Sequence, residues 1–340
     1  MKRDGAVPFR LGAMRALAIH DGGRLAVEER PVPEPGGDQV LVRVHGAGIN
    51  RADLLQRAGG YPAPAGVPPD IPGLEFAGTV ATVGPDVRSL RTGDRVMGIV
   101  GGGAQAEYLV TSESHCARVP EGIDLLAAGG VPEAFITAQD AMIVQGCLHT
   151  GETVLVHAVA SGVGTAAVQL ACVLGATVVG TSRSKEKLDR VAELGMDHGV
   201  VAEPEFDPTD RARRITEAAG GPAHVTLDLV GGRYLAVDLA AAAPKGRVVV
   251  VGLIAGGRAD LDLRTLLAKR LTVLGTVLRA RPPEEKAEAT YVFAGQVVPL
   301  LAAGTVRPVI EEVVPLAEAE RGYDVVAADG TFGKIVLDLT

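Results

Sequence analysis

The stretch from residue 153 to residue 182 contains no formally charged side chain, and it restricts the fold more than any other part of the chain. It is long enough to span a bilayer, but Gly162, Gly164, Gly175 and Gly180 interrupt it. These glycines divide it into a strand, a turn, a helix and a second strand. Two strands joined by a crossover helix belong to a parallel sheet. We therefore expect an α/β fold and no transmembrane segment.

Helices and apolar strands continue to alternate until about residue 278. Uninterrupted Val- and Leu-rich strands between helices are typical of a doubly wound parallel sheet, which is buried on both faces. The hydrophobic periodicity predicts helices at 133–146, 163–174, 184–194, 208–219 and 232–242. It predicts strands at 153–159, 177–182, 198–202, 225–230, 246–252 and 271–278.

The segments that flank this region have a different character. Residues 20–130 are rich in short strands and in turns that contain Pro and Gly, as in an antiparallel β domain. Polar and apolar residues alternate at 39–49, which indicates a half-buried strand. A final strand is predicted at 333–339.

The simplest organisation is a β domain with an α/β domain inserted into it. We predict that residues 1–133 and 279–340 form the β domain, and that residues 134–278 form the α/β domain. Residues 1–13 show no periodicity, so we interpret them as an extension ahead of a first strand at 14–20.

The composition excludes several classes of function. The formal net charge is -8, whereas sequence-independent binding of nucleic acid needs an excess of Lys and Arg. The three cysteines include no CxxC pair, so neither a disulfide framework nor a Cys-rich zinc site is expected. This use of cysteine is typical of the reducing cytoplasm.

The turn inside the uncharged stretch predicts a dinucleotide site. Ser161, Gly162, Val163 and Gly164 follow a buried strand and open a helix of small residues, although the GxGxxG pattern is incomplete. Glycines let the backbone approach a pyrophosphate, and the helix N-terminus offers N–H groups and a positive dipole to it. Ser161 either bonds the cofactor or caps the helix.

The end of the second strand carries information about the cofactor. A site for NAD would place a carboxylate here to accept the ribose hydroxyls. The chain instead has Ser182 and Arg183, followed by Lys187. Cations without a carboxylate favour a 2′-phosphate, so we predict NADPH; the alternative is a solvated helix start that happens to be basic.

Several separate motifs resemble a known family. Residues 50–61 match N-x-x-D-x-x-x-R-x-G-x-Y, residues 72–78 match P-G-x-E-x-x-G, and residues 93–96 match G-D-R-V. With the segments 101–108 and 246–257, they resemble the medium-chain dehydrogenase/reductase superfamily. The resemblance is to its zinc-independent quinone oxidoreductases related to zeta-crystallin, in particular the stress-inducible branch. It implies a GroES-like β domain and a Rossmann domain.

The sequence also departs from relatives in the same superfamily. Where its zinc alcohol dehydrogenases have a Cys and a His, this chain has Asn50 and Leu74, which are poor or impossible zinc ligands. Their four-Cys structural lobe is also missing. Both departures predict that no metal takes part. Close relatives often carry a Tyr where this chain has Val201 and Ala202, which weakens the prediction of NADPH.

The resemblance implies roles for further residues. Asn50 and Tyr61 are implied to contact a substrate carbonyl as hydrogen-bond donors, and Thr137 to contact the nicotinamide. The residues Gly252, Leu253 and Ala255 follow a predicted strand at the sheet edge where such folds bind ligands. The spacing of Asp53 and Arg57 favours an ion pair along one helical turn. Arg279 either reaches the cofactor or substrate or ends a strand.

These observations predict a zinc-independent, NADPH-dependent enzyme that transfers hydride to a quinone. The alternatives are an NADPH-dependent 2-alkenal or enoyl reductase with the same pocket, and a nucleotide-binding sensor without turnover. The apolar strand at 271–278 invites pairing with a second copy. In the family it joins two sheets, so we expect a homodimer or homotetramer.

Overall fold

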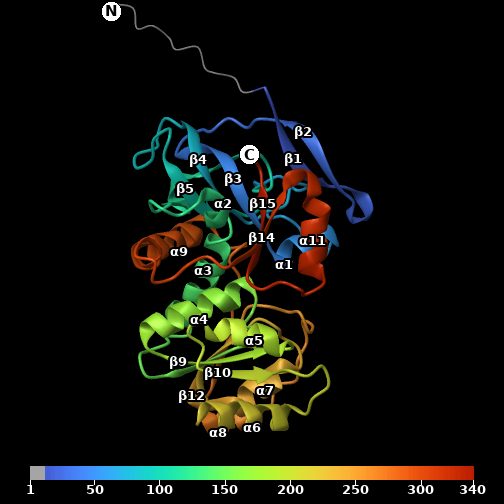
Figure 1. Cartoon of the computed structure of the whole chain (residues 1–340), viewed down its shortest axis with the longest axis vertical. Coiled ribbons are helices and arrows are strands. Elements are labelled where there is room, and N and C mark those ends of the chain that lie inside the picture. Colours follow the sequence, from blue (N-terminus) through green and yellow to red (C-terminus); the bar gives the residue numbers. More distant parts are fainter. Residues whose placement is uncertain (1–11) are drawn as a thin grey trace, which may run out of the picture.

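The computed structural model describes residues 12–340. The predicted extension at residues 1–13 therefore lies almost entirely outside the described part. Figure 1 shows two lobes stacked along the long axis, with both ends of the described chain in the upper lobe. No helix within residues 12–340 is long and apolar enough to cross a membrane.

The lower lobe is built on a six-stranded sheet in the order β10-β9-β8-β11-β12-β13, and all its pairs are parallel. The chain leaves β8 in one direction and later returns to β8's other side, which makes the sheet doubly wound as predicted. The strands are β8 (Thr153–Val156), β9 (Thr177–Ser182), β10 (His198–Val201), β11 (Ala223–Asp228), β12 (Ala242–Val250) and β13 (Thr272–Gly275).

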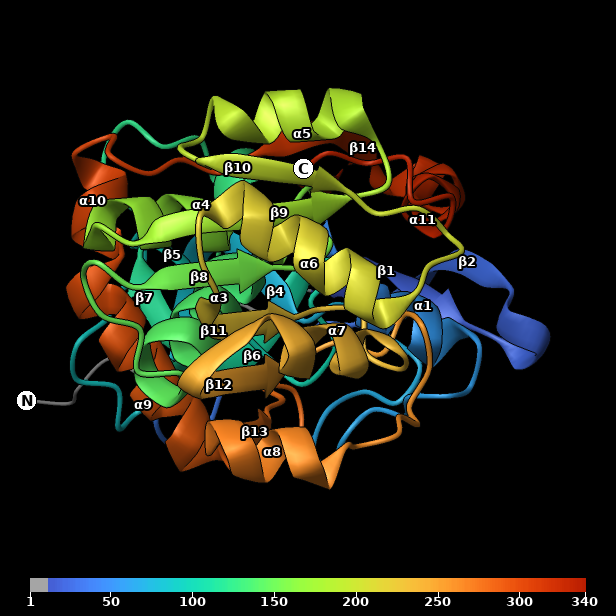
Figure 2. The ribbon, with the colours of Figure 1, turned by 90° about the horizontal axis from the view of Figure 1, so that it is seen from below.

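Helices cover both faces of this sheet. Leu155 and Val179 pack toward the helices α6 and α7, whereas Val154 and Val178 pack toward α4 and α5. Because alternate residues point to opposite faces, both faces must be apolar. In Figure 2, α6 and α7 cross in front of the strands. The helices are α4 (Gly162–Leu174), α5 (Lys185–Ala192), α6 (Pro208–Ala219), α7 (Tyr234–Ala241) and α8 (Leu263–Lys269).

The upper lobe contains a seven-stranded sheet in the order β14-β15-β3-β4-β5-β7, with β6 also paired to β3. Its pairs are antiparallel except β14 with β15, which are parallel. A separate hairpin joins β1 (Ala13–Ile19) and β2 (Leu25–Pro31). The strands are β3 (Gln39–Ile49), β4 (Glu75–Val83), β5 (Arg95–Ile99), β6 (Tyr108–Ser112), β7 (Cys116–Arg118), β14 (Ile310–Pro315) and β15 (Lys334–Asp338).

Helix α3 (Pro132–Gln139) joins the two lobes. Its side chains Phe135 and Ile136 belong to one hydrophobic core that includes Met97 of β5 and Val156 of β8. The predicted helix at 133–146 is this helix followed by a π-helical turn at Asp140–Gln145. The domain boundaries at 133/134 and 278/279 stay a prediction. The other helices are α1 (Arg51–Arg57), α2 (Leu125–Ala128), α9 (Pro283–Gln296), α10 (Val298–Ala302) and α11 (Ala319–Ala327).

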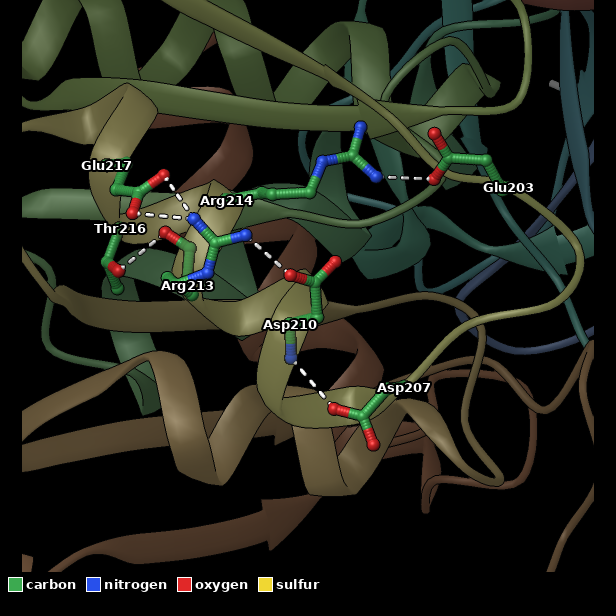
Figure 3. A network of polar contacts seen from close by, with 7 residues as sticks. All are labelled: Glu203, Asp207, Asp210, Arg213, Arg214, Thr216 and Glu217. Carbon is green, nitrogen blue, oxygen red and sulfur yellow. Dashed lines mark hydrogen bonds and ion pairs between the residues drawn. The ribbon is translucent and has the colours of Figure 1, made fainter.

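Charged side chains cover the solvent face of α6, as Figure 3 shows. Arg213 lies between Asp210 at 2.5 Å and Glu217 at 2.8 Å, and Arg214 pairs with Glu203 at 2.7 Å. Ion pairs this exposed contribute about 0–1 kcal/mol each. This network therefore lies on a solvated face of α6. Substitutions in it are expected to have little effect on stability, so its residues can serve as controls.

Candidate functional site

The turn after β8 carries the residues that are predicted to bind a dinucleotide, and its glycines are required by close packing. A Cβ atom on Gly164 would collide with the backbone oxygen of Val159, so a glycine is needed for the close approach of helix and strand. A Cβ atom on Gly162 would collide with the side chain of Lys334, which comes from β15 in the other lobe. At both positions, therefore, a side chain larger than that of glycine would collide with neighbouring atoms.

Ser161 is the N-cap of α4. Its hydroxyl accepts a hydrogen bond from the N–H of Gly164 at 3.1 Å, which is the capping alternative of the two predicted roles. The N–H groups of Gly162 and Val163 have no acceptor within the helix. The N–H of Gly162 lies on the side of the turn that bridges to Gly333, so the N–H of Val163 is the one that suits an anion at the positive end of the helix dipole.

The three residues predicted to bind a 2′-phosphate lie together at the end of β9. The Ser182 hydroxyl accepts from the N–H of Ser184 at 3.3 Å. Arg183 donates to the carboxylate of Asp329 at 2.7 Å, and Lys187 donates to the main-chain oxygen of Asp329, also at 2.7 Å. Both cations therefore bind one residue of the other lobe, and the carboxylate of that residue is paired with Arg183.

The loop after β12 lies at the same edge of the sheet. Gly252 donates to the main-chain oxygen of Asp228 at 3.1 Å, and Ala255 donates to that of Val230 at 2.8 Å. Leu253 is exposed. Because the strands are parallel, the ends of β8, β9 and β12 all meet at this edge, where α/β sheets bind ligands.

Thr137 of α3 carries a buried hydroxyl without a partner. Its side chain is 6% exposed, and no described group bonds its oxygen. A buried hydroxyl without a hydrogen bond is costly. The contact of Thr137 with the nicotinamide stays a prediction, and this unpartnered hydroxyl is the local feature that favours it.

Asn50 is held by a buried ionic network. Its Oδ1 accepts a hydrogen bond from Nζ of Lys334 at 2.6 Å, and its Nδ2 donates to Glu75 at 3.1 Å. The second Nδ2 hydrogen faces the oxygen of Gly48 at 3.4 Å, a long contact. Both amide hydrogens therefore have acceptors within the protein, and the one toward Gly48 makes the weaker contact.

Arg279 positions the loop that carries Tyr61. It is 2% exposed and donates to the main-chain oxygens of Tyr61 at 3.0 Å and Gly101 at 2.8 Å. Its guanidinium also lies 4.8 Å from the centre of the Tyr61 ring. Arg279 thus joins two loops of the upper lobe. This role differs from both expectations, a contact with cofactor or substrate and the end of a strand.

Burial and like charges perturb the acids around Asn50. Burial raises the pKa of Asp53 to about 6, although hydrogen bonds from the N–H groups of Asn50 and Gly73 oppose the shift. Burial, followed by the charge of Glu75, raises the pKa of Glu133 to about 8. The group of acids around Asn50 therefore includes a carboxyl that is largely protonated at neutral pH.

The predicted ion pair between Asp53 and Arg57 is wrong. Asp53 is fully buried and accepts from the backbone at the start of α1, while Arg57 turns outward to Glu320 and to the oxygen of Gly23. Capping the helix start satisfies buried N–H groups, and an exposed pair would contribute little.

Sequence reasoning missed the residue that connects the two halves of the site. The stem of Lys334 packs on Gly162 of the dinucleotide turn, and its ammonium binds Asn50 and, at 2.6 Å, Glu75. A signal was present, because Glu75 and Lys334 each stand directly before apolar residues, Phe76–Ala77 and Ile335–Leu337. Charges at such positions are almost never fully buried unless paired.

The described residues show no preformed metal centre. Among residues 12–340, no group of three or more His, Cys, Asp or Glu is arranged to hold a metal ion. Leu74 is 1% exposed and belongs to the core, so an apolar side chain fills the position that a His has in the zinc alcohol dehydrogenases.

Two family models match the chain. The model described as a zinc-binding dehydrogenase matches residues 162–293, and the model described as an alcohol dehydrogenase GroES-like domain matches residues 36–121. The two matches fall on the lower and the upper lobe, respectively, for most of their length.

The chain is also similar to curated proteins and solved structures. It is 32% identical to quinone oxidoreductase of Rattus norvegicus, covering 95% of this chain and 97% of that protein. It is 34% identical to quinone oxidoreductase of Pseudomonas aeruginosa, covering 89% and 92%. A mycobacterial protein solved in complex with NADPH has a TM-score of 0.85 at 27% identity, covering 96% and 99%. The quinone oxidoreductase of Coxiella burnetii has a TM-score of 0.79 at 26% identity, covering 96% and 100%.

Proposed function

The chain belongs to the quinone oxidoreductase-like proteins of the medium-chain dehydrogenase/reductase superfamily, and from this membership we propose that it is a zinc-independent, NADPH-dependent quinone oxidoreductase. The observation that carries the proposal is the position of Lys334. It touches the dinucleotide turn at Gly162 and the candidate acceptor residue Asn50 at once. A cofactor on the turn and a substrate at Asn50 would therefore be neighbours.

The candidate residues at the start of α4, in α3 and at the end of β9 fit a nicotinamide dinucleotide. The N–H of Val163 at the start of α4 suits the pyrophosphate, and the unpartnered hydroxyl of Thr137 suits a polar group such as the carboxamide. When bound, NADPH supplies the hydride, and the protein supplies position and electrostatics. Arg183 and Lys187 supply positive charge for a 2′-phosphate.

Reduction of a quinone or enone develops negative charge on a carbonyl oxygen, which preorganised donors stabilise. Asn50 can donate its weakly bound amide hydrogen. Tyr61 is half-buried, and burial raises the pKa of its phenol while Arg279 lowers it, with a net rise. The phenol is therefore protonated at neutral pH and can donate.

The proposal includes independence from zinc. It is supported by the amide of Asn50 and the apolar side chain of Leu74, because zinc in proteins takes thiolate, imidazole or carboxylate ligands. Hydride supplies one hydrogen of the quinol and water can supply the single proton that completes it, so no Lewis acid is required. A cytoplasmic location is part of the proposal, and it is supported by the three free cysteines.

A homodimer or homotetramer is proposed from the edge of the lower sheet. β13 is an edge strand, and large apolar side chains are exposed around it. Exposed apolar patches of this kind mark interaction sites. The exposed residues are Leu253, Ile254, Leu261, Leu263, Leu267 and Val277.

The deciding experiment follows oxidation of NADPH by absorbance with 1,4-benzoquinone and 9,10-phenanthrenequinone, with NADH in parallel and EDTA present. Turnover that favours NADPH and is insensitive to EDTA supports the proposal. Turnover only with short enals or enones would move the assignment to an alkenal or enoyl reductase. Binding of NADPH without turnover of any acceptor would support a sensor instead.

A further inference from the structure

Asp329 lies where the candidate phosphate cations meet the loop between α11 and β15. Its Oδ2 accepts a hydrogen bond from Arg183 at 2.7 Å, and its Oδ1 forms an ion pair with Arg51 of α1. Its main-chain oxygen accepts from Lys187 at 2.7 Å. Three cations, from two different lobes, therefore converge on one residue.

The loop that carries Asp329 is fixed beside the dinucleotide turn. Gly333 donates its N–H to the oxygen of Ala160 at 2.8 Å, immediately before the turn. The guanidinium of Arg190, on α5, lies 4.0 Å from the centre of the Phe332 ring. These contacts hold the Phe332–Gly333 end of the loop against the lower lobe, and Asp329 holds the other end through Arg183 and Lys187.

The carboxylate of Asp329 is ionised. Burial acts to raise its pKa, but the hydrogen bond from Arg183 and the charge of Arg51 outweigh it and lower the pKa below its usual value. An anion of the protein thus already neutralises part of the positive charge that a 2′-phosphate would need.

We propose that Asp329 is a specificity-determining residue, which acts as an internal anion on Arg183 and competes with the 2′-phosphate of NADPH. This inference rests on the proposed assignment of Arg183 and Lys187 to that phosphate. A phosphate carries about −1.5 to −2 charges at neutral pH, so it must displace the carboxylate from Arg183 and is repelled by it. The 2′-hydroxyl of NADH meets no such repulsion. Asp329 therefore lowers the affinity for NADPH relative to that for NADH.

The test uses two fragments of the cofactor that need no acceptor. Adenosine 2′,5′-bisphosphate and 5′-AMP are titrated by calorimetry into the full-length protein and its Asp329→Asn variant, in a phosphate-free buffer of low ionic strength. Removing one negative charge beside the phosphate is expected to tighten binding of the bisphosphate about tenfold. Binding of 5′-AMP is expected to change by less than about twofold, which also reports that the variant is folded.

Matched variants separate the charge of Asp329 from its shape and from general effects of charge. Asp329→Glu keeps the charge and should bind the bisphosphate as the parent protein does. Asp324→Asn removes an equal charge from an exposed position on α11 and should change neither affinity. Arg183→Ala should weaken binding of the bisphosphate, whereas Arg213→Ala, on the exposed face of α6 in Figure 3, should not.

The outcomes distinguish this inference from the proposed cofactor preference. If the parent protein prefers the bisphosphate and Asp329→Asn does not strengthen that preference, the role of Asp329 is overturned and the NADPH assignment stands. If the parent shows no preference and Asp329→Asn gains one, the role of Asp329 stands and the NADPH preference is overturned. If neither protein prefers the bisphosphate, both are overturned.

Discussion

Nζ of Lys334 lies 2.6 Å from Oδ1 of Asn50, although the two residues are 284 positions apart in the sequence. The same ammonium is 2.6 Å from Glu75, which is completely buried. Taking a carboxylate out of water is costly unless a cation and hydrogen bonds compensate for it. The geometry of Asn50 therefore depends on one buried cation that is supplied by the last strand of the chain.

The substitution Lys334→Met should destabilise the protein by about 3–5 kcal/mol, because it leaves Glu75 buried without a cation. Unfolding in urea, followed by circular dichroism, measures the loss. The double variant Glu75→Gln with Lys334→Met should recover much of it, since no uncompensated charge remains. A loss below about 1 kcal/mol for Lys334→Met would show that Glu75 has another source of compensation.

Thr137→Val should affect stability and cofactor binding in opposite directions. Valine keeps the shape but removes a buried hydroxyl without a partner, so the free protein should gain about 1 kcal/mol. Binding of NADPH should weaken about fivefold if the hydroxyl bonds the cofactor. The chain has no Trp, so the fluorescence of NADPH itself can report binding.

Thr226→Val is the matched control for Thr137→Val. Its hydroxyl is also buried without a partner, but it lies within β11. This variant should gain stability without any change in the affinity for NADPH. Equal affinities in all three proteins would remove Thr137 from the cofactor site.

The lower lobe was predictable from sequence because its constraints are local. Its six strands and the helices α4 to α7 follow from apolar runs and their spacing, whereas the short helix α8 was not predicted. The glycines at 162 and 164 are needed where the chain turns. The contacts of Lys334 and Asp329 were not predictable. Each joins segments far apart in the sequence, and only the packing of the two lobes decides which charges meet.

The error at Asp53 and Arg57 has a similar origin. Spacing along a helix states which side chains can meet, but not which face of the helix is buried. In α1, Asp53 faces the core and Arg57 faces Glu320 of α11. Tertiary contacts therefore override the local pairing preference.

Tyr61→Phe tests the phenol as a donor to the substrate carbonyl. The substitution keeps the ring over the guanidinium of Arg279 but removes the hydroxyl, so kcat for quinones should fall by about tenfold or more. The affinity for NADPH should not change. Tyr291→Phe removes the hydroxyl of an exposed tyrosine on α9 and should leave kcat as it is. An unchanged kcat in Tyr61→Phe would exclude the phenol as a donor.

Glu133 predicts a specific dependence of stability on pH. Its folded-state pKa of about 8 lies above the usual value, so the folded protein keeps a proton that the unfolded chain has released. The stability associated with that proton is present at acidic pH and is lost as pH rises toward about 8. Glu133→Gln should therefore melt close to the parent at pH 5 and at a higher temperature at pH 8.5.

Calorimetry of both proteins across that range measures the difference. Glu121→Gln, at an exposed position, should follow the parent at every pH. If the melting curves of Glu133→Gln and the parent stay parallel from pH 5 to pH 8.5, the carboxyl of Glu133 is ionised in the folded protein.

The edge of the lower sheet should be the subunit interface. Leu263 and Leu267 on α8 are 60% and 75% exposed beside the edge strand β13. Burying apolar side chains of this size is worth about 1.5–3 kcal/mol each, so the double change to Glu should dissociate the assembly. Sedimentation of the parent should give at least twice the chain mass of 34.9 kDa, and the variant should approach the mass of one chain. Val173→Glu, at an exposed position on α4, should sediment like the parent, and a parent protein that sediments as a single chain would contradict the interface.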